Sequence, residues 1–567
     1  MKKDKWSSQL GIILAVSGSA VGLGNFLKFP GQVATYGGAA FMTAYIFSFF
    51  MIAMPLSIAE WTLGRQGGHL GYNSAVGILY SITKKKIFKY IGILGVLLTA
   101  FIFSYYVYIE AWCLGYAVNF ILENLNFTGF EQSAGFFAEF TGITRNGGAF
   151  EFSHLRLMPY LMIVFALNFY LIFKGVSKGI EFFCKYAMPL LLLMGLVLVI
   201  RIMCLAPVDE TKPEQTVNQG LGFMWNPEKI TLEKFEGSSW VESERIVGDI
   251  ALANAQELAM EKPQEYRVVT MGLLEQLSQP QLWMAATGQV FFSLTVGFGA
   301  IMTYTSYMRK KDDVVLSSVV SAATNEFCEV CIGGLITVPA AVAFFGVAGT
   351  MGAGLGLFDL GFKVLPVFFS TLPAGSFFGF LFFGLLFLGA VTSSISMLQP
   401  SLSFFEEAME LKRTKSVSYV LLLISPISLY VAYYSEGLKA LSTMDFWGGQ
   451  VLVYIFAIIV AIVSVWVIGA RYTIHMANEN SLMQLSNKVA FVLKYFTPTF
   501  LIFMFIAWLF TDVFTGKNEN INDIFGSNPS MVAIVCLSMI IAVAFLFSLI
   551  IFYSKSYNID KNGRRIK

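Results

Sequence analysis

Two glycine-rich segments lie inside stretches that are otherwise apolar enough to be helices. They cover residues 18–25 (GSAVGLGN) and 293–299 (SLTVGFG), and Val-Gly-x-Gly occurs in both. Each glycine inside a helix costs about 1 kcal/mol relative to alanine, so both segments predict a local unwinding of the backbone. Close helix packing through Gly18 and Gly22 is the alternative for the first segment alone. The recurrence of the pattern favours two broken helices.

An unwound backbone inside a membrane needs partners for its free N–H and C=O groups. Half-helix N-termini suit a carboxylate, and freed carbonyls suit an ammonium group or a hard cation. A zwitterionic amino acid meets both requirements.

Polar side chains in other apolar stretches add oxygen ligands to this candidate site. They are Asn325 and Glu329 in one stretch and Thr392 and Ser393 in another. Ionisable groups at membrane depth are costly, which makes each a functional candidate. Asn25, Ser293, Asn325, Thr392 and Ser393 supply neutral oxygens. Because this set of five contains no carboxylate, it suits a monovalent hard cation. For any single Ser or Thr, a bond back to the carbonyl four residues earlier is the alternative.

The composition places these residues in a membrane protein. Of 567 residues, 56% are hydrophobic and 13% are charged, whereas globular domains have about 25% charged residues. The 38 basic and 36 acidic residues are too balanced for a nucleic-acid-binding protein. Three histidines, far apart in the sequence, argue against a His-based metal or catalytic site.

Twelve stretches reach the length of about 20 mostly apolar residues that a membrane-spanning helix needs. Basic clusters, such as Lys84, Lys85 and Lys86, fall on one side, which the positive-inside rule makes cytoplasmic. The acidic segment at about 207–281 lies on the other side and is expected to cap an outer vestibule, with a short helix at 250–260. The expected spans are 8–29, 40–64, 88–122, 157–174, 179–205, 282–308, 314–346, 376–411, 416–434, 445–470, 487–511 and 530–553.

The glycine segments fall in the first and sixth spans, which predicts an all-α integral membrane protein with two inverted five-helix repeats. Broken helices 1 and 6 would open the repeats, and helices 11 and 12 would follow them. We expect a multi-pass protein of the cell (inner) membrane with both termini cytoplasmic. The predicted regions are the first repeat (1–205), the long extracellular loop (206–281), the second repeat (282–470) and the last two helices with the tail (471–567).

These residues resemble the neurotransmitter:sodium symporter family, most closely its bacterial leucine-transporter-like members. The resemblance runs over nearly all twelve spans. It implies a symporter that imports a small or medium neutral, aliphatic amino acid with sodium by alternating access. Its most specific stretches are 18–30 (GSAVGLGNFLKFP), 105–110 (YYVYIE), 288–307 (GQVFFSLTVGFGAIMTYTSY), 325–329 (NEFCE), 392–400 (TSSISMLQP) and 444–447 (MDFW).

The resemblance also implies two sodium sites. The substrate's own carboxylate would complete the first, which would make sodium and substrate binding mutually supportive. The first site would use the Ala20 carbonyl with Asn25, Ser293 and Asn325, and the second would use the carbonyls of Gly18, Val21 and Gly389 with the hydroxyls of Thr392 and Ser393.

The implied substrate site lies between the two breaks. Amides from Ala20 to Gly24 and the Tyr106 hydroxyl would hold the carboxylate, and the Ala20 and Phe292 carbonyls with the Thr295 hydroxyl would hold the ammonium. A side-chain pocket without a charged residue selects aliphatic substrates, because a charge could not be paired there. Its walls would be Ile102, Phe292, Phe298, Ser393 and Met397.

The resemblance assigns Glu329 the negative charge that chloride supplies in chloride-dependent relatives, so no chloride is expected and outward proton transport through Glu329 is implied. The outer gate would pair Lys28 with Asp445, although lysine lacks the bidentate fork of the usual arginine. The inner gate would consist of Lys3, Trp6, Tyr307 and Glu407.

Two other functions fit the same architecture: a proton-coupled amino-acid carrier and a non-transporting amino-acid sensor. An enzyme is not expected, because the spans hold no nucleophile–base pair or metal-ligand set. The expected partners are a small-molecule amino acid, sodium and the lipid bilayer, without nucleic acid, and a homodimer stays open.

Overall fold

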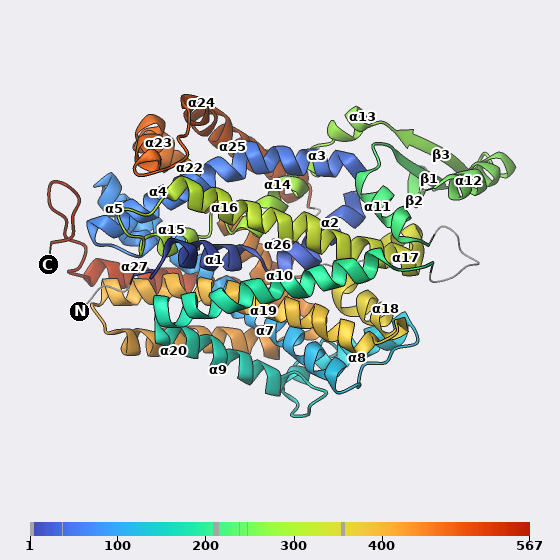
Figure 1. Cartoon of the computed structure of the whole chain (residues 1–567), viewed down its shortest axis with the longest axis horizontal. Coiled ribbons are helices and arrows are strands. Elements are labelled where there is room, and N and C mark those ends of the chain that lie inside the picture. Colours follow the sequence, from blue (N-terminus) through green and yellow to red (C-terminus); the bar gives the residue numbers. More distant parts are fainter. Residues whose placement is uncertain are drawn as a thin grey trace.

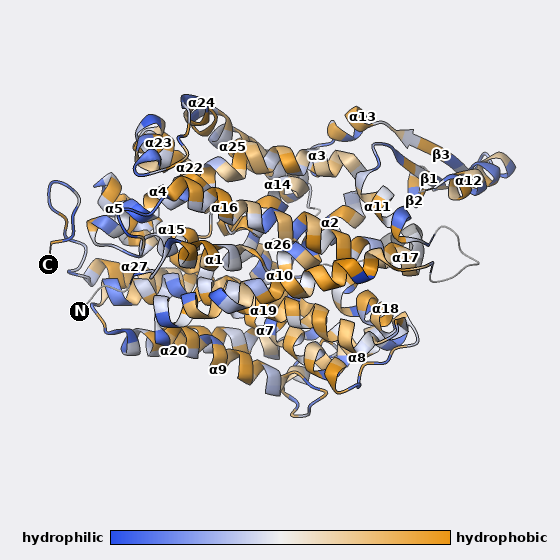
Figure 2. Ribbon diagram, in the orientation of Figure 1, coloured by the Kyte–Doolittle hydropathy of each residue, from blue (hydrophilic) through white to orange (hydrophobic). Residues whose placement is uncertain are grey.

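The computed structural model describes residues 5–36, 38–207, 215–237, 239–246, 248–352, 358–516 and 518–566. Long helices form a bundle, with both ends of the chain at one end of it and a small β-sheet at the other (Figure 1). Hydrophobic residues cover the helices of the bundle, and hydrophilic residues are frequent at its two ends (Figure 2). The predicted gate residue Lys3 lies outside the described residues.

The first part of the chain consists of helices, several of which continue through a π-helical turn (η). They are α1 (Gln9–Ala20), η1 (Gly24–Lys28), α2 (Phe29–Tyr36), α3 (Gly38–Ser48), η2 (Phe49–Ala53), α4 (Met54–Leu70), α5 (Ala75–Thr83), α6 (Ile87–Ile91), α7 (Ile93–Ile121), α8 (Phe130–Thr141), the 3₁₀ turn η3 (Gly148–Phe150), α9 (Met158–Lys174), η4 (Val176–Glu181) and α10 (Phe182–Met203).

A mixed segment follows and includes the sheet. It consists of α11 (Val217–Trp225), β1 (Lys229–Glu236), β2 (Ser239–Ile246), α12 (Asp249–Glu261), β3 (Tyr266–Met271) and α13 (Leu273–Leu277).

The remainder is again helical. It consists of α14 (Pro280–Leu294), α15 (Ala300–Thr305), α16 (Val314–Glu326), η5 (Phe327–Gly334), α17 (Leu335–Gly352), η6 (Leu360–Val364), α18 (Leu365–Thr371), α19 (Gly375–Ala408), α20 (Arg413–Tyr433), the 3₁₀ turn η7 (Glu436–Leu438), α21 (Lys439–Met444), η8 (Asp445–Leu452), α22 (Val453–Ile462), η9 (Val463–Val467), α23 (Ala470–Asn478), α24 (Asn487–Phe491), η10 (Val492–Phe496), α25 (Thr497–Trp508), η11 (Leu509–Val513), α26 (Glu519–Phe525) and α27 (Met531–Tyr553).

Nine helices within the described residues are long and apolar enough to cross a membrane. The count is ten if α1 and the segment 24–36, which are bent by 45° relative to each other, form one span. Of the other predicted spans, α9 is a shorter apolar helix, and α14 and α15 are separated by a break. The count of twelve and the inverted repeats stay predictions.

The outer loop differs from the expectation of a purely helical protein. Its three strands form an antiparallel sheet in the order β2-β1-β3, with Ile230 opposite Ile246 on one side and opposite Thr270 on the other. The predicted short helix is present as α12, which packs on the sheet through Leu232, Ile246 and Ala255. The strands were missed because charged residues interrupt their apolar alternation.

The core lies along α19, which packs on α7 and on α10. Both broken segments lie against this core: α1 contacts α10, α16 and α19, and α15 contacts α4 and α19. The fold therefore places unwound backbone inside protein, where other residues can satisfy its polar groups.

Candidate functional site

The first break begins directly after Ala20. Val21 is extended (φ −74°, ψ 103°), and helical structure resumes at Gly24. Two freed amides find side-chain acceptors: Gly22 N donates to Asn25 Oδ1 at 2.8 Å, and Leu23 N donates to the Tyr106 hydroxyl at 3.4 Å. A Cβ atom on Gly22 would lie 2.6 Å from Ser393 Oγ and 2.8 Å from the Tyr106 hydroxyl, so a larger residue here would displace these two polar groups.

The second break begins after Leu294. Thr295, Gly297 and Gly299 all have positive φ (53°, 81° and 78°), which ends α14 before α15 starts at Ala300. Gly297 N donates to Glu60 Oε1 at 3.0 Å, so this intramembrane acid stabilises the break. The Thr295 hydroxyl is buried and has no hydrogen-bond partner among the described residues. A buried hydroxyl without a partner is unfavourable, which makes it available to a ligand.

Three predicted ligands of the first sodium site meet beside these breaks. Asn25 Nδ2 donates to Asn325 Oδ1 at 2.9 Å, and Asn325 Nδ2 donates to Ser293 Oγ at 2.6 Å. The Ser293 hydroxyl donates to Glu329 Oε2. All four side chains are buried. Ala20, at the end of α1, is also buried.

Gln289 belongs to the same network but was missed in the sequence. Its Nε2 donates to Glu329 Oε1 at 2.6 Å and to the Gly24 carbonyl at 3.2 Å. It is a polar residue in an apolar stretch, one turn before Ser293, so the criterion that identified Asn325 could have found it.

The predicted second sodium site lies where α1 meets α19. Ser393 Oγ donates to the carbonyls of Ser19 (3.1 Å) and Gly389 (2.9 Å) and lies 3.5 Å from the Gly18 carbonyl. Thr392 Oγ1 lies 3.0 Å from the Gly389 carbonyl and 3.1 Å from that of Leu388. Both hydroxyls thus bond to the carbonyl four residues earlier in their own helix, which was the alternative to a ligand role. Ser393 also contacts carbonyls of α1. A Cβ atom on Gly389 would lie 3.2 Å from the Val21 carbonyl, so this carbonyl is close as well.

The predicted substrate residues lie around the same breaks. Gly24, Tyr106 and Phe292 line a small cavity of about 30 Å³. The Phe292 and Phe298 rings are 6.3 Å apart, edge to face. Ile102 and Met397 are buried in the surrounding core and do not line this cavity.

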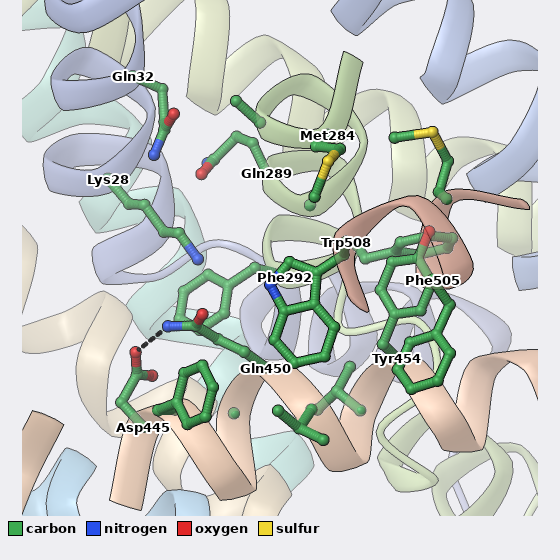
Figure 3. Close-up of a pocket in the computed structure, with 18 residues that line it drawn as sticks. Lys28, Gln32, Met284, Gln289, Phe292, Asp445, Gln450, Tyr454, Phe505 and Trp508 are labelled. Carbon is green, nitrogen blue, oxygen red and sulfur yellow. Dashed lines mark hydrogen bonds between the residues drawn. The ribbon is translucent and has the colours of Figure 1, made fainter. Parts of the chain in front are cut away.

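A second, larger cavity of about 390 Å³ lies between η1, α14, η8 and α25 and shares Lys28, Phe292 and Asp445 with the small one. Figure 3 shows Lys28 pointing toward Phe292 and Gln450 bonded to Asp445; Gln289 also lines the cavity. Lys28 Nζ is 4.0 Å from the centre of the Phe292 ring. Asp445 accepts hydrogen bonds from the Tyr105 hydroxyl (2.7 Å) and Gln450 Nε2 (2.8 Å). The predicted outer-gate residues therefore share a cavity, but no ion pair joins them among the described residues.

The predicted inner-gate residue Trp6 is buried, with 1% of its surface exposed. Its Nε1 donates to the Tyr304 carbonyl at 2.8 Å, and the two rings pack edge to face.

The two remaining inner-gate candidates lie in separate groups. The Tyr307 hydroxyl bonds to Ser403 (2.9 Å) and accepts from Gln399 (3.0 Å). The Glu407 carboxylate accepts from the Asn73 amide (2.8 Å) and from Ser74 Oγ (2.6 Å).

The geometry defines a membrane transporter, with oxygen-rich sites at two broken helices and a cavity that leads to them. The chain belongs to the sodium:neurotransmitter symporter family, whose model matches residues 3–206 and 267–558.

Relatives and solved structures agree with this assignment. A sodium-dependent transporter of Haemophilus influenzae is 27% identical over 73% of this chain and 77% of its own length. A sodium-dependent transporter of Methanocaldococcus jannaschii is 28% identical over 83% of this chain and 83% of its own length. The crystal structure of MhsT in complex with L-phenylalanine is similar with a TM-score of 0.69 and 25% identity, covering 89% of this chain and 99% of MhsT. The chain is therefore a member of a transporter family and not an enzyme.

Proposed function

We propose that this protein is a symporter that imports a small or medium neutral, aliphatic amino acid together with sodium by alternating access. The observation that carries the proposal is the buried network of Asn25, Ser293 and Asn325 beside the unpartnered Thr295 hydroxyl. The network offers oxygen ligands to a monovalent cation, and the hydroxyl offers an acceptor to an ammonium.

Two sodium ions fit the donors of this chain. The first would use Asn25, Ser293, Asn325 and the Ala20 carbonyl, and the second would use the hydroxyls of Thr392 and Ser393 with the carbonyls of Gly18, Val21 and Gly389. The second sodium site is supported by the Ser393 hydroxyl, which lies close to the Gly389 carbonyl and to the carbonyls of Gly18 and Ser19 in the last turn of α1. In both places the chain supplies oxygens only, as a hard cation requires.

An amino-acid substrate is supported by the MhsT neighbour, which was solved with L-phenylalanine. In this chain the carboxylate would meet the amides of the first break and Tyr106, and the ammonium would meet Thr295 and the Ala20 and Phe292 carbonyls. Ile102 and Met397 do not line the small cavity in this structure, but they would limit the occupied pocket to aliphatic side chains together with Phe292, Phe298 and Ser393.

Chloride is not required in this proposal, because Glu329 places a carboxylate next to the first sodium site. Its two oxygens accept from Ser293 and Gln289. Return of the empty carrier with a proton on Glu329 would give proton countertransport. We place the protein in the cell (inner) membrane with both termini cytoplasmic.

Alternating access requires that the site open to one side at a time. The larger cavity would give access to the site from one side, and the contact of Trp6 with Tyr304 would close the other side. Substrate would therefore enter from the side of the larger cavity and pass Lys28 and Asp445.

Binding of twenty radiolabelled amino acids to the purified full-length protein, in sodium and in potassium at one pH, tests the proposal. Neutral aliphatic amino acids should bind in sodium and not in potassium. Equal binding in both cations would contradict it.

Two further measurements separate the alternatives. Uptake into proteoliposomes that follows a pH gradient instead of a sodium gradient would indicate a proton-coupled carrier. Binding without counterflow would indicate a sensor.

A further inference from the structure

The family model leaves residues 207–266 unmatched, and this insertion contains an arginine that is buried against the helical bundle. The insertion includes α11, β1, β2 and α12. The sheet and α12 project beyond the end of the bundle (Figure 1). Arg245, near the end of β2, is nevertheless only 4% exposed.

The Arg245 guanidinium binds the last residue of α2. Its Nη1 donates to the Tyr36 carbonyl at 3.1 Å, and the group stacks on the Phe223 ring of α11 with 5.0 Å to the ring centre. The last carbonyls of a helix lack intrahelical partners and carry its negative dipole end, so a cation is favourable there. Burial lowers the pKa of Arg245 to about 10, although the negative charge of Glu242 acts in the opposite direction. The guanidinium therefore stays charged at neutral pH.

A second contact from the insertion holds the start of α3. The Ala39 amide donates to the Asn226 carbonyl at 2.8 Å. A Cβ atom on Gly38 would lie 2.6 Å from that carbonyl, and Gly38 has φ of 67°, so the first residues of α3 fit closely against the insertion. The insertion itself is anchored, because α11 and β2 pack on α17.

The segment held in this way is the half-helix beyond the first break. Residues 24–36 are bent by 45° from α1 and include Lys28 and Gln32, which line the larger cavity. A half-helix that the break separates from α1 can tilt relative to it, and such a tilt would move Lys28 and Gln32 in the cavity wall.

We propose that Arg245 is a positioning residue that holds the outer end of α2 in the arrangement that keeps the outer cavity open. Replacing a charge-assisted hydrogen bond of this kind shifts a two-state equilibrium by about tenfold. Loss of Arg245 should therefore shift the protein toward a closed cavity.

The test is the labelling rate of a cysteine at Met284, a cavity residue on α14, with a membrane-impermeant thiol reagent. The background carries C204S and C331S, because these two native cysteines are exposed. R245Q should lower the labelling rate at least threefold, and R245K, which keeps the charge and N–H donors but loses the planar guanidinium, should restore part of it.

The matched control is R267Q. Arg267 pairs with Glu233 and stacks on Trp240 within the sheet, so its loss disturbs the insertion without releasing α2. A folded R245Q that labels at the parent rate, or an R267Q that labels as slowly as R245Q, overturns the proposal. If R245Q does not fold, F223L is measured in its place. This variant removes the ring on which the Arg245 guanidinium stacks and leaves the Tyr36 carbonyl that the guanidinium binds.

External KM for the amino acid is the second readout, and R245Q should raise it with little change in the maximal rate. Only this readout rests on the proposed transport function. The labelling result stands even if no amino acid is transported.

Discussion

The side-chain amide of Asn25 donates to Oδ1 of Asn325 across 2.9 Å, which ties the first broken helix to α16. Ser293, at the end of α14, joins the same network through Asn325. Segments that are far apart in the sequence thus meet at one buried point. A cation bound there would hold both broken helices at once, and its binding would favour one relative arrangement of them.

Removing the Asn325 side chain should weaken sodium binding. In N325A the site loses an oxygen ligand, and the Asn25 amide loses its best acceptor, so the sodium concentration for half-maximal amino-acid binding should rise at least tenfold. Sodium titrations of binding to the purified protein measure this. N146A is the control, since exposed Asn146 bonds only near the surface, to Glu436. An unchanged sodium dependence in N325A would contradict the assigned site.

Replacing Glu329 with serine should create a chloride requirement. The carboxylate accepts from Ser293 and Gln289, and its removal would leave these donors and the proposed first sodium site without a negative charge. Chloride can fill the space because the same donors suit a small anion. Uptake by E329S should fall at least tenfold in gluconate and recover in chloride, whereas the parent protein should transport equally in both. Chloride dependence of the parent would show that the carboxylate does not serve this role.

The positions of the breaks could be predicted because glycine acts locally. Residues 18–25 and 293–299 contain the two interruptions that the structure shows, after Ala20 and after Leu294. Glycine weakens a helix whatever surrounds it, so the sequence alone carries this information. The meeting of the candidate ligands Asn25 and Asn325 in one buried network could be anticipated for a similar reason, since a polar residue in an apolar span is conspicuous.

Side-chain pairing depends on tertiary geometry and was harder to predict. Lys28 and Asp445 have opposite charges and share a cavity, but Asp445 is bonded to Tyr105 and Gln450, and Lys28 lies over Phe292. Local competition among neighbours decides such partners. The role of Arg245 was also missed, because its acceptor is a backbone carbonyl, and no sequence pattern marks one.

The Thr295 hydroxyl should contribute to binding and not to folding. It has no partner among the described residues, so T295V removes no hydrogen bond from the protein and keeps the branched shape. The thermal midpoint without substrate should stay the same or rise, and the substrate Kd should increase about tenfold. T295S keeps a hydroxyl and should bind within about threefold of the parent. A T295V protein with parental affinity would place the ammonium elsewhere.

The Trp6 indole should keep the inner end of the site closed. Its N–H donates to the Tyr304 carbonyl, which ties the segment before α1 to α15. W6F keeps an aromatic ring for the edge-to-face contact but loses the donor, whose net contribution is about 1 kcal/mol. The open inner state should therefore become about fivefold more populated.

A cysteine at Ser403, beside Tyr307, reports this opening in inside-out vesicles of the C204S, C331S background. Its labelling rate should rise about fivefold in W6F, and sodium should reduce the difference if it favours the closed inner side. W466F is the control, because the exposed Trp466 indole bonds to the Lys494 carbonyl and to no residue of the candidate site. Equal labelling of W6F and W466F would mean that other contacts, such as those of Ser7 with Glu181, hold the inner end closed.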